Sequence, residues 1–339
     1  MKERKFQEEV QYFNRKLYEI IEQKMQGYSN KILYDALSYI RDTGGKRLRP
    51  IICLLSAEAA GGSRDKALFA AVGIELLHNA SLVHDDIIDE SSIRRKNPSN
   101  PARYGEKKAI VMGDLLFGFA CEMLARCGVP EVVGLVSSAI SDTAMGQYLE
   151  FMLRLRDLQE VTEQSYLEVA TLKTASTFMA STEAGAILGG GSEAEIENLR
   201  NYGKNLGIAF QIHDDVLDIC GDSAKTGKPV GLDIKNAERT VLVIHALKHS
   251  NPSEREYLLK VLSKKGDAGS SDIDRVREIF INSSSINYAI WLSNELIRDA
   301  KSCIEELEDS EAKEKLKFIA DFAADRIENH ALAAFLPER

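Results

Sequence analysis

Residues 80–99, ASLVHDDIIDESSIRRKNPS, end a long apolar segment with a group of acidic residues that is followed by two arginines. If this segment is a helix, Asp85 and Asp89 are four residues apart and share one face, with Asp86 beside them. Carboxylates held this close repel one another by an energy on the order of several kcal/mol at an effective dielectric constant near 20. The stretch therefore predicts a helix end that holds a cation.

The same pattern occurs twice, as HDDIID at 84–89 and as HDDVLD at 213–218. Each copy lies near the end of a long apolar segment and precedes a basic loop. Carboxylates without accompanying histidine or cysteine ligands suit Mg²⁺. A solvated acidic helix end explains a single DDxxD equally well, whereas two copies in matching contexts favour two halves of one site. An EF-hand is excluded because the DxDxDG pattern is missing.

The fold class follows from the length and composition of the segments around these motifs. Proline accounts for only 7 of 339 residues, and the breaks between apolar segments are short. Four long segments are rich in alanine and leucine and are apolar on more than one side, as in helices inside a bundle: 66–90, 107–126, 132–157 and 196–219. We expect one all-α domain over residues 1–339, with ten or more helices and no convincing strand.

Composition limits the classes of function. With 44% hydrophobic and 28% charged residues the chain is typical of a soluble globular protein, and a net charge of −9 argues against nucleic acid as a partner. The five cysteines are an odd number in mostly apolar surroundings, which indicates reduced thiols and a cytoplasmic location. We expect no signal peptide and no transmembrane segment, which would need about 18 apolar residues.

Basic residues accompany the acidic motifs. The stretch TGGKRLRP (43–50) places Lys46, Arg47 and Arg49 beside two glycines, while Arg94 and Arg95 follow the first acidic motif. The loop after the second motif carries basic residues too, at Lys225 and Lys228. Arginine and lysine are the usual ligands of phosphate groups. Together with paired magnesium motifs, they predict a pocket for a polyanion.

Six motifs in this order resemble the trans-isoprenyl diphosphate synthases, or polyprenyl synthetases, and among them the geranylgeranyl diphosphate synthases. They are GGKRLRP (44–50), LVHDDIIDESSIRR (82–95), GQYLE (146–150), LKTAS (172–176), FQIHDDVLD (210–218) and TGKPVGLDI (226–234). The resemblance implies the isoprenoid synthase fold, a helical bundle around a central cavity. It also implies a reaction in which isopentenyl diphosphate attacks the cation left by an allylic diphosphate, which releases pyrophosphate and then a proton.

The resemblance further assigns roles to individual residues. About three Mg²⁺ would be held by carboxylates, with Glu150 nearby: Asp85, Asp86, Asp89, Asp214, Asp215 and Asp218. The allylic diphosphate would be bound by Arg94, Lys173 and Lys228, and isopentenyl diphosphate by Lys46, Arg49, His78 and Arg95. Thr174 and Gln211 would line the reacting end. The family is commonly homodimeric, so we expect a homodimer.

Two positions need separate comment. His78 on its own would be read as a packed core histidine, and only the resemblance gives it a ligand role. The family commonly has a lysine five residues after the aspartate of GLDI, whereas this chain has Glu238, with Arg239 next to it. Arg239 is a candidate replacement for the missing cation, and neither residue is included in the predicted binding set.

Product length can be predicted from the helix that bears the first motif. In the family, large residues four and five positions before the first aspartate stop the growing chain, but Ser81 and Ala80 are small here. They lie about 6 to 8 Å below Asp85 along a helix, and Leu77 lies about 12 Å below it. Because one isoprene unit is roughly 5 Å long, we expect a C20 product or a longer one, with Phe117 on the facing helix as a second candidate stop.

Two other functions stay open. A terpene cyclase shares the helices, the first DDxxD and the magnesium, but its second motif usually has asparagine, serine and glutamate ligands. It also lacks the isopentenyl diphosphate site suggested by Lys46 and Arg49. A non-catalytic partner subunit of a prenyl synthase is disfavoured by the two intact aspartate motifs.

Overall fold

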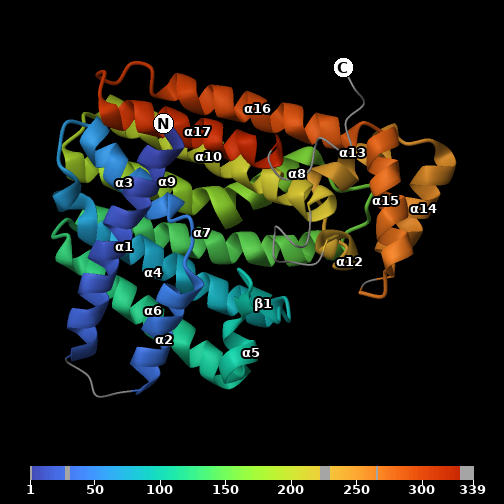
Figure 1. The fold of residues 1–339 in the computed structure, drawn as a ribbon. Helices are drawn as coiled ribbons and strands as arrows, with labels where there is room; N and C mark the ends of the chain where they lie inside the picture. The colour runs from blue at the N-terminus through green and yellow to red at the C-terminus, as the bar shows by residue number, and fades with distance from the viewer. Residues whose placement is uncertain (1, 27–30, 222–229, 265, 329–339) are drawn as a thin grey trace. The chain divides into compact units, whose positions relative to one another are not determined.

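The computed structural model describes residues 2–26, 31–221, 230–264 and 266–328, and it confirms the all-α fold class (Figure 1). The chain contains two compact units. The first unit comprises Met1–Ser138, Ala180–Arg200 and Glu306–Phe318. The second unit comprises Ala139–Met179, Asn201–Glu305 and Ile319–Arg339.

The helices follow one another closely, and more than ten are present in the described residues. Those wholly in the first unit are α1 (Lys2–Gln26), α2 (Lys31–Thr43), α3 (Leu48–Ala59), α4 (Arg64–Ile88), α5 (Asn100–Tyr104) and α6 (Glu106–Arg126). Those wholly in the second are α8 (Glu163–Ala170), the π-helix η1 (Thr171–Ala175), α12 (Leu232–Lys235), α13 (Val241–His249), α14 (Pro252–Leu262), α15 (Ser270–Asn282) and α16 (Ser285–Cys303). The unit boundaries fall inside α7 (Pro130–Leu155), α9 (Ser176–Gly189), α10 (Glu193–Cys220) and α17 (Glu311–Glu328).

Helix α4 forms the centre of the first unit and packs against α3 and α6. Its close approach to α6 depends on two glycines. A Cβ added at Gly73 would lie 2.9 Å from Leu124, and one at Gly113 would lie 2.2 Å from the His84 ring. Because α4 is packed on more than one side, most of its residues must be apolar.

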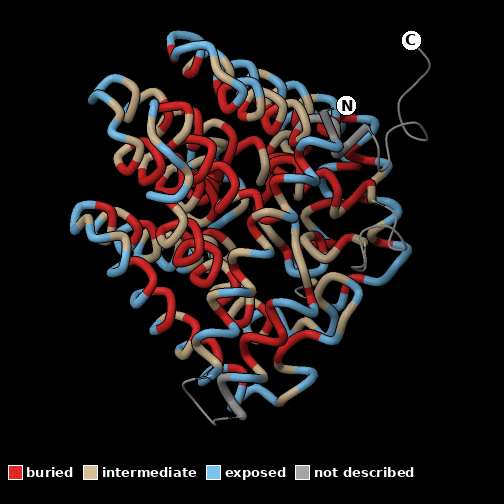
Figure 2. Tube along the Cα trace, turned by 60° about the vertical axis from the view of Figure 1, so that its left-hand side comes forward, coloured by how far each residue is buried: buried red, intermediate tan, exposed pale blue. Residues whose placement is uncertain are grey.

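The apolar composition of α4 has a second consequence. Among the described helices, α4 is the one whose length and composition would also allow it to cross a membrane, although the sequence predicts no such segment. However, 67% of its apolar window is buried inside the structure, as is usual for the core helix of a folded bundle. Figure 2 marks the buried residues of the chain in red.

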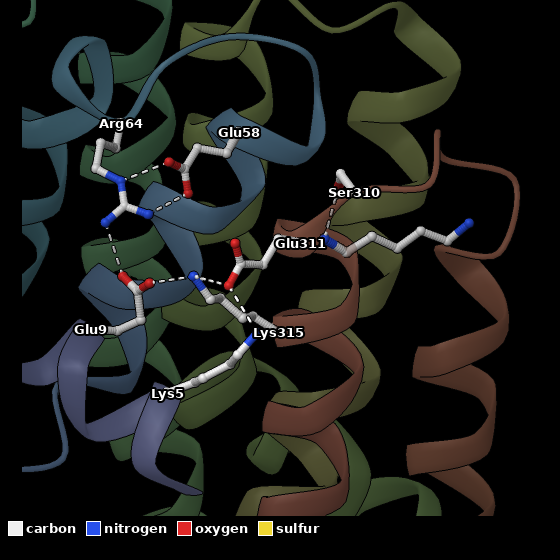
Figure 3. A network of polar contacts seen from close by, with 8 residues as sticks. Lys5, Glu9, Glu58, Arg64, Ser310, Glu311 and Lys315 are labelled. Carbon is white, nitrogen blue, oxygen red and sulfur yellow. Dashed lines mark hydrogen bonds and ion pairs between the residues drawn. The ribbon is translucent and has the colours of Figure 1, made fainter. Parts of the chain in front are cut away.

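An ion-pair network joins α1 and α17 to α3 and the start of α4 (Figure 3). Glu9 is buried and accepts from Lys315 Nζ at 2.7 Å and from Arg64 Nη1 at 3.0 Å. The Arg64 guanidinium also contacts both carboxylate oxygens of Glu58 at 2.7 Å. The network therefore ties residues from the two ends of the chain to one place in the first unit.

The core of the second unit is built from α10, α13, α15 and α16. Its buried side chains include Ile212, Val216, Val243, Phe280 and Ala289. Helix starts in both units are capped by side chains close by in the sequence. The Ser192 hydroxyl and the Glu195 carboxylate form the reciprocal capping box, and the Asn251 side chain accepts from the Glu254 backbone N–H at 3.0 Å.

One short hairpin departs from the expectation of no strands. Strands β1 (Ile93–Arg94) and β2 (Asn97–Pro98) pair antiparallel, with Arg94 opposite Asn97. The two turn residues, Arg95 and Lys96, have φ of 51° and 66°. A two-residue type I′ turn needs positive φ at both positions, which usually selects glycine or asparagine. This chain has neither glycine nor asparagine at the two turn positions, so its sequence gives no recognisable indication of a hairpin.

Candidate active site

The acidic group of the first unit lies at the C-terminal end of α4. Asp85 and Asp86 are in its last turn and Asp89 directly follows it, so Asp85 and Asp89 are one helical turn apart, as predicted. The Asp89 backbone N–H donates to the Asp85 carbonyl at 2.8 Å. Asp86 is buried, Asp85 is half-buried and Asp89 is exposed. The three carboxylates therefore differ in how readily each can meet a ligand.

Asp86 is bound by Arg94, which the β1–β2 hairpin carries back to the end of α4. Arg94 Nε lies 2.8 Å from Asp86 Oδ1, and a second guanidinium nitrogen contacts the same oxygen. Burial lowers the pKa of Arg94, but the hydrogen bond and charge of Asp86, aided by Asp85, outweigh it and raise the pKa. Burial, with the negative charge of Asp86, raises the pKa of Tyr39 to about 12, so a neutral phenol lies beside the pair.

The GGKRLRP stretch forms the loop before α3. Arg47 has a left-handed backbone (φ 53°) and is buried, and its guanidinium reaches Glu75 at 2.5 Å and Asn14 at 3.0 Å. It also donates to the Ile40 carbonyl at 3.0 Å. Arg47 therefore has a structural role that fixes this loop against α1, α2 and α4. Lys46, in contrast, is exposed, and Arg49 is half-buried.

Positive charges gather around His78 on α4. Burial lowers the pKa of His78 well below its usual value, and the charges of Arg49, Arg95, Arg94 and Arg47 lower it further. The imidazole is therefore neutral at physiological pH. Of these four guanidinium groups, Arg47 is paired with Glu75 and Arg94 with Asp86, and the group as a whole would attract an anion. Four of the predicted diphosphate ligands, Arg49, His78, Arg94 and Arg95, thus lie together in the first unit.

Arg95 is positioned by the two glycines of the same loop. Its guanidinium donates to the Gly44 carbonyl, and a Cβ at Gly45 would lie 2.4 Å from Arg95 Nη1. Burial lowers the pKa of Arg95, as do the charges of Arg47 and Arg94, whereas Glu75 opposes them. Glycine at position 45 therefore leaves room for the guanidinium to approach the backbone.

The second acidic group lies in the last two turns of α10. Asp215 is buried, and each of its oxygens accepts a hydrogen bond, from Tyr166 Oη at 2.7 Å and from Gln211 Nε2 at 2.8 Å. Burial raises the pKa of Asp215 to about 7 despite these two hydrogen bonds, and the negative charges of Asp214 and Glu150 add to the rise. The neighbouring Asp233 behaves in the same way, since burial and then Asp218 raise its pKa.

Asp218 stabilises the start of α12. Its Oδ1 accepts from the Leu232 N–H at 3.2 Å and its Oδ2 from the Asp233 N–H at 3.0 Å. A carboxylate at a helix N-terminus satisfies backbone donors and interacts favourably with the helix dipole. Asp215 and Asp218 both hold other groups in place, and Asp214 is half-buried.

Residues of α7 and η1 join the second acidic group. Lys173 Nζ donates to Glu150 Oε2 at 2.7 Å, and Thr174 Oγ1 donates to Gln211 Oε1 at 2.6 Å. A Cβ at Gly146 would lie 2.3 Å from the Lys173 backbone N, so glycine is needed where α7 passes η1. Thus Glu150, Lys173, Thr174 and Gln211, all predicted from sequence, lie in one connected group. Lys228 lies outside the described residues.

Arg154 was not predicted to take part, and neither was its partner. Arg154 Nε donates to Glu238 Oε2 at 2.9 Å, and the guanidinium makes a second contact with the other Glu238 oxygen. Burial and then Glu150 raise the pKa of Glu238 to about 8, against the opposing charges of Arg154 and Lys173. Arg239 donates instead to the carbonyls of Ala237 at 2.8 Å and Arg154 at 3.0 Å. Its guanidinium therefore holds backbone at the end of α7.

The donor sets fit magnesium better than a soft metal. Both acidic groups present carboxylate oxygens, which Mg²⁺ prefers, and it usually binds one or two protein carboxylates with water and substrate phosphates completing the shell. Consistent with such sparse ligation, the described residues contain no ready cluster of three or more histidine, cysteine, aspartate or glutamate side chains able to enclose a metal.

The residues predicted to set product length lie on α4 toward α6. Ala80 is fully buried, Leu77 is buried, and Ser81 is half-buried with its hydroxyl donating to the His78 carbonyl at 2.9 Å. At helical spacing they share a face with His84, whose ring lies 5.6 Å from that of Phe117 on α6. The structure therefore brings Phe117 to the face of α4 that carries the small residues.

Comparison with known proteins gives a family and several relatives. The family model described as "Polyprenyl synthetase" matches residues 30–280. The chain is 39% identical over 312 residues to a short chain isoprenyl diphosphate synthase of Methanothermobacter thermautotrophicus, with 91% of this chain and 94% of that protein covered.

Solved structures are similar along almost the whole chain. One is a geranylgeranyl pyrophosphate synthetase of Pyrococcus horikoshii, with a TM-score of 0.84 and 34% identity over 95% of this chain and 97% of that one. Another is a polyprenyl synthase of Caulobacter crescentus complexed with calcium and isoprenyl diphosphate, with a TM-score of 0.83 and 31% identity over 92% and 98% of the two chains.

Proposed function

The chain belongs to the polyprenyl synthetase family, and from this premise we propose how its residues carry out head-to-tail condensation of isopentenyl diphosphate with an allylic diphosphate. The chain is a trans-prenyltransferase that lengthens a polyprenyl diphosphate and releases pyrophosphate. One observation, made in each unit, supports the roles assigned below. A carboxylate on a helix is paired with a cation from a separate segment: Asp86 with Arg94 in the first unit and Glu150 with Lys173 in the second.

The cations of the two groups serve the two substrates. Arg49, His78 and Arg95, with Lys46, bind isopentenyl diphosphate; their support is the gathering of guanidinium groups around a neutral His78. Arg94, Lys173 and Lys228 bind the allylic diphosphate. Arg94 and Lys173 are both held by carboxylates before substrate arrives, so their orientation costs little entropy at binding.

Divalent metal would be bound through the aspartates of the two motifs, namely Asp85, Asp86 and Asp89 in the first unit and Asp214, Asp215 and Asp218 in the second. About three Mg²⁺ held there would supply Lewis-acid stabilisation of the charge that develops on the departing pyrophosphate. Within this set we assign direct contact to Asp85, Asp89 and Asp214. Asp86, Asp215 and Asp218 act mainly through the Arg94, Tyr166 and α12 contacts that they maintain.

The product is C20 or longer. The support is the pair of small residues, Ala80 and Ser81, on the face of α4 that turns toward Phe117. After ionisation, the chain's own residues have to keep water from the allylic cation, and Thr174 and Gln211, hydrogen-bonded to each other, line that end of the site. The released pyrophosphate accepts the final proton, so no protein base is assigned.

The test uses the purified chain with Mg²⁺, radiolabelled isopentenyl diphosphate and farnesyl diphosphate, with products identified by mass spectrometry. An elongated prenyl diphosphate supports the proposal. A cyclised hydrocarbon would identify a terpene cyclase, and no product would identify a non-catalytic subunit. EDTA should abolish turnover and added Mg²⁺ should restore it.

Single substitutions of aspartate distinguish the loss of a metal ligand from the loss of negative charge in general. Removing one carboxylate from either motif, by Asp85→Asn or Asp214→Asn, should lower kcat/KM by about 100-fold or more and raise the Mg²⁺ concentration required. The matched control is Asp299→Asn on the exposed side of α16, which should behave as the unmodified chain does. Equal rates in all three variants would contradict the assignment.

We also propose a cytoplasmic homodimer. Its support is a stripe of exposed apolar residues on α7, Met145, Tyr148 and Met152, at helical spacing on the side away from Gln147 and Glu150. The five cysteines are unpaired, which suits a reducing compartment. Light scattering should give twice the chain mass, and Tyr148→Asp should shift it toward the monomer; a monomer from the unmodified chain would exclude the dimer.

A further inference from the structure

Glu150 collects an unusual number of donors on one oxygen. Lys173 Nζ lies 2.7 Å from Oε2, Gln147 Nε2 lies 3.0 Å from it and Arg154 Nη2 lies 3.4 Å from it. A carboxylate oxygen has about two lone-pair sites. Three donors therefore exceed what this oxygen can fully accept, and the arrangement retains capacity to bind another anion.

The two cations at Glu150 are close together. Because Lys173 and Arg154 contact the same oxygen, at 2.7 and 3.4 Å, their charged nitrogens lie within about 6 Å of one another. Both side chains are largely covered, with 27% and 23% of their surface exposed. Glu150 offsets the repulsion between these two cations, and a diphosphate, which carries more negative charge than one carboxylate, competes with it for both.

Glu238 fixes Arg154 in this position. It receives the guanidinium through two nitrogens, and its side chain is only 12% exposed. A two-point contact of this kind restricts the planar guanidinium to one orientation. Arg239 does not share this position, since it donates to the carbonyls of Ala237 and Arg154.

We propose that Arg154 is a further diphosphate-binding residue of the second unit, that it acts beside Lys173, and that Glu238 is the positioning residue that aims it. The inference rests on the proposed function. The ligand it recognises is the diphosphate group of the allylic substrate or the pyrophosphate released from it. When that anion is present, the guanidinium keeps both contacts with Glu238, through Nε and Nη2, and exchanges the 3.4 Å contact between Nη2 and Glu150 for one with a phosphate oxygen.

The experiment measures binding of inorganic pyrophosphate in the presence of Mg²⁺ by isothermal titration calorimetry, together with KM for each substrate. Arg154→Gln should weaken pyrophosphate binding by about 10- to 100-fold, which is the range for one charge-assisted hydrogen bond. The KM for the allylic diphosphate should rise in parallel, while that for isopentenyl diphosphate should change by less than about twofold. Arg154→Lys keeps the charge and should give an intermediate loss.

Glu238 is tested in the same assays. Glu238→Gln should weaken pyrophosphate binding less than Arg154→Gln does, because the charge remains and only its orientation is lost. The double variant should match Arg154→Gln. The control is Lys301→Gln, which removes a cation paired with Asp321 at 2.9 Å in the same unit and should leave binding unchanged.

A purely structural ion pair would give a different pattern. Losses would then follow the melting temperature, and the double variant, with a neutral pair of similar shape, would recover both stability and binding. Pyrophosphate binding by Arg154→Gln or Arg154→Lys equal to that of the unmodified chain would overturn the inference. Failure of the unmodified chain to bind pyrophosphate or to lengthen a prenyl chain would instead overturn the proposed function.

Discussion

Arg94 Nε lies 2.8 Å from Asp86 Oδ1, so one carboxylate of the first DDxxD motif is already neutralised by a side chain of this chain. Asp86 is 1% exposed, whereas Asp85 is half-buried and Asp89 is exposed. Although the motif is written as three similar aspartates, the fold gives them different tasks. Asp86 holds Arg94, for which we propose a role in binding diphosphate, and Asp85 and Asp89 lie at the helix end with more exposure.

This difference predicts separate effects on stability. Asp86→Asn should lower the free energy of unfolding by about 1 to 3 kcal/mol, because it leaves a mostly buried guanidinium without its charged partner. Asp89→Asn should change it by less than about 0.5 kcal/mol, since the side chain is exposed. Urea denaturation in EDTA measures both. Similar losses in the two variants would show that Asp86 and Asp89 are equivalent.

The raised pKa of Asp215 predicts a pH dependence. Burial raises its pKa from 3.8 to about 7 in the folded chain, so the folded state retains a proton that the unfolded state releases. The contribution of Asp215 to the free energy of unfolding is therefore greatest below pH 4, and it is lost as the pH rises to about 7. Asp215→Asn lacks this loss and should gain up to about 2 kcal/mol relative to the unmodified chain between pH 5 and pH 7.

Unfolding by urea at several pH values, with EDTA present, checks the effect. The comparison should be repeated with Tyr166→Phe, which removes a hydrogen bond to the ionised Asp215 carboxylate at 2.7 Å. Because that hydrogen bond lowers the pKa of Asp215, its removal should raise the pKa further, so the loss of stability should continue to a higher pH and become larger in total. A constant difference between Asp215→Asn and the unmodified chain across the pH range would contradict the raised pKa.

The network around Glu9 predicts a stability effect remote from any substrate. Glu9 is 6% exposed and contacts both Arg64 and Lys315, so Glu9→Gln leaves two cations short of charge compensation (Figure 3). We expect a loss of about 2 to 4 kcal/mol. Thermal unfolding checks it against Lys16→Gln, which breaks only an exposed pair with Glu19 and should change stability by less than about 0.5 kcal/mol. Equal melting temperatures would show that the network does not stabilise the fold.

Local sequence patterns predicted much of the fold and of the candidate site, because they depend on residues close in the chain. The i, i+4 aspartates Asp85 and Asp89 are of this kind. The caps at Ser192 and Asn251 likewise depend only on residues three positions away. Arg154 could not be found this way, since its partner Glu238 is 84 residues further along the chain. The hairpin at Arg95 and Lys96 gave no signal because neither residue usually has positive φ.

Buried charges mark a second limit of sequence patterns. In TGGKRLRP, the basic residues Lys46, Arg47 and Arg49 look alike, but the fold turns Arg47 inward to Glu75 and leaves Lys46 exposed. Which arginine is structural depends on an acidic residue in another helix, 28 positions away. A useful indication was available, however: an isolated glutamate in the apolar stretch around Glu75 needs a buried cation as its partner.

The product-length assignment makes the last prediction. Ala80→Phe places an aromatic ring on the face of α4 that turns to Phe117, about 8 Å below Asp85 and within two isoprene units of it. The product should shorten from C20 or longer to C15. Phe117→Ala should have the opposite effect and allow longer products. Product analysis by mass spectrometry checks both, and Ile110→Phe, an exposed position on α6, is the control. Because an added ring can overpack the core and destabilise the fold by about 1 to 3 kcal/mol, the melting temperature of each variant must be measured as well. If Ala80→Phe is folded and active but its product length is unchanged, this face of α4 does not set product length.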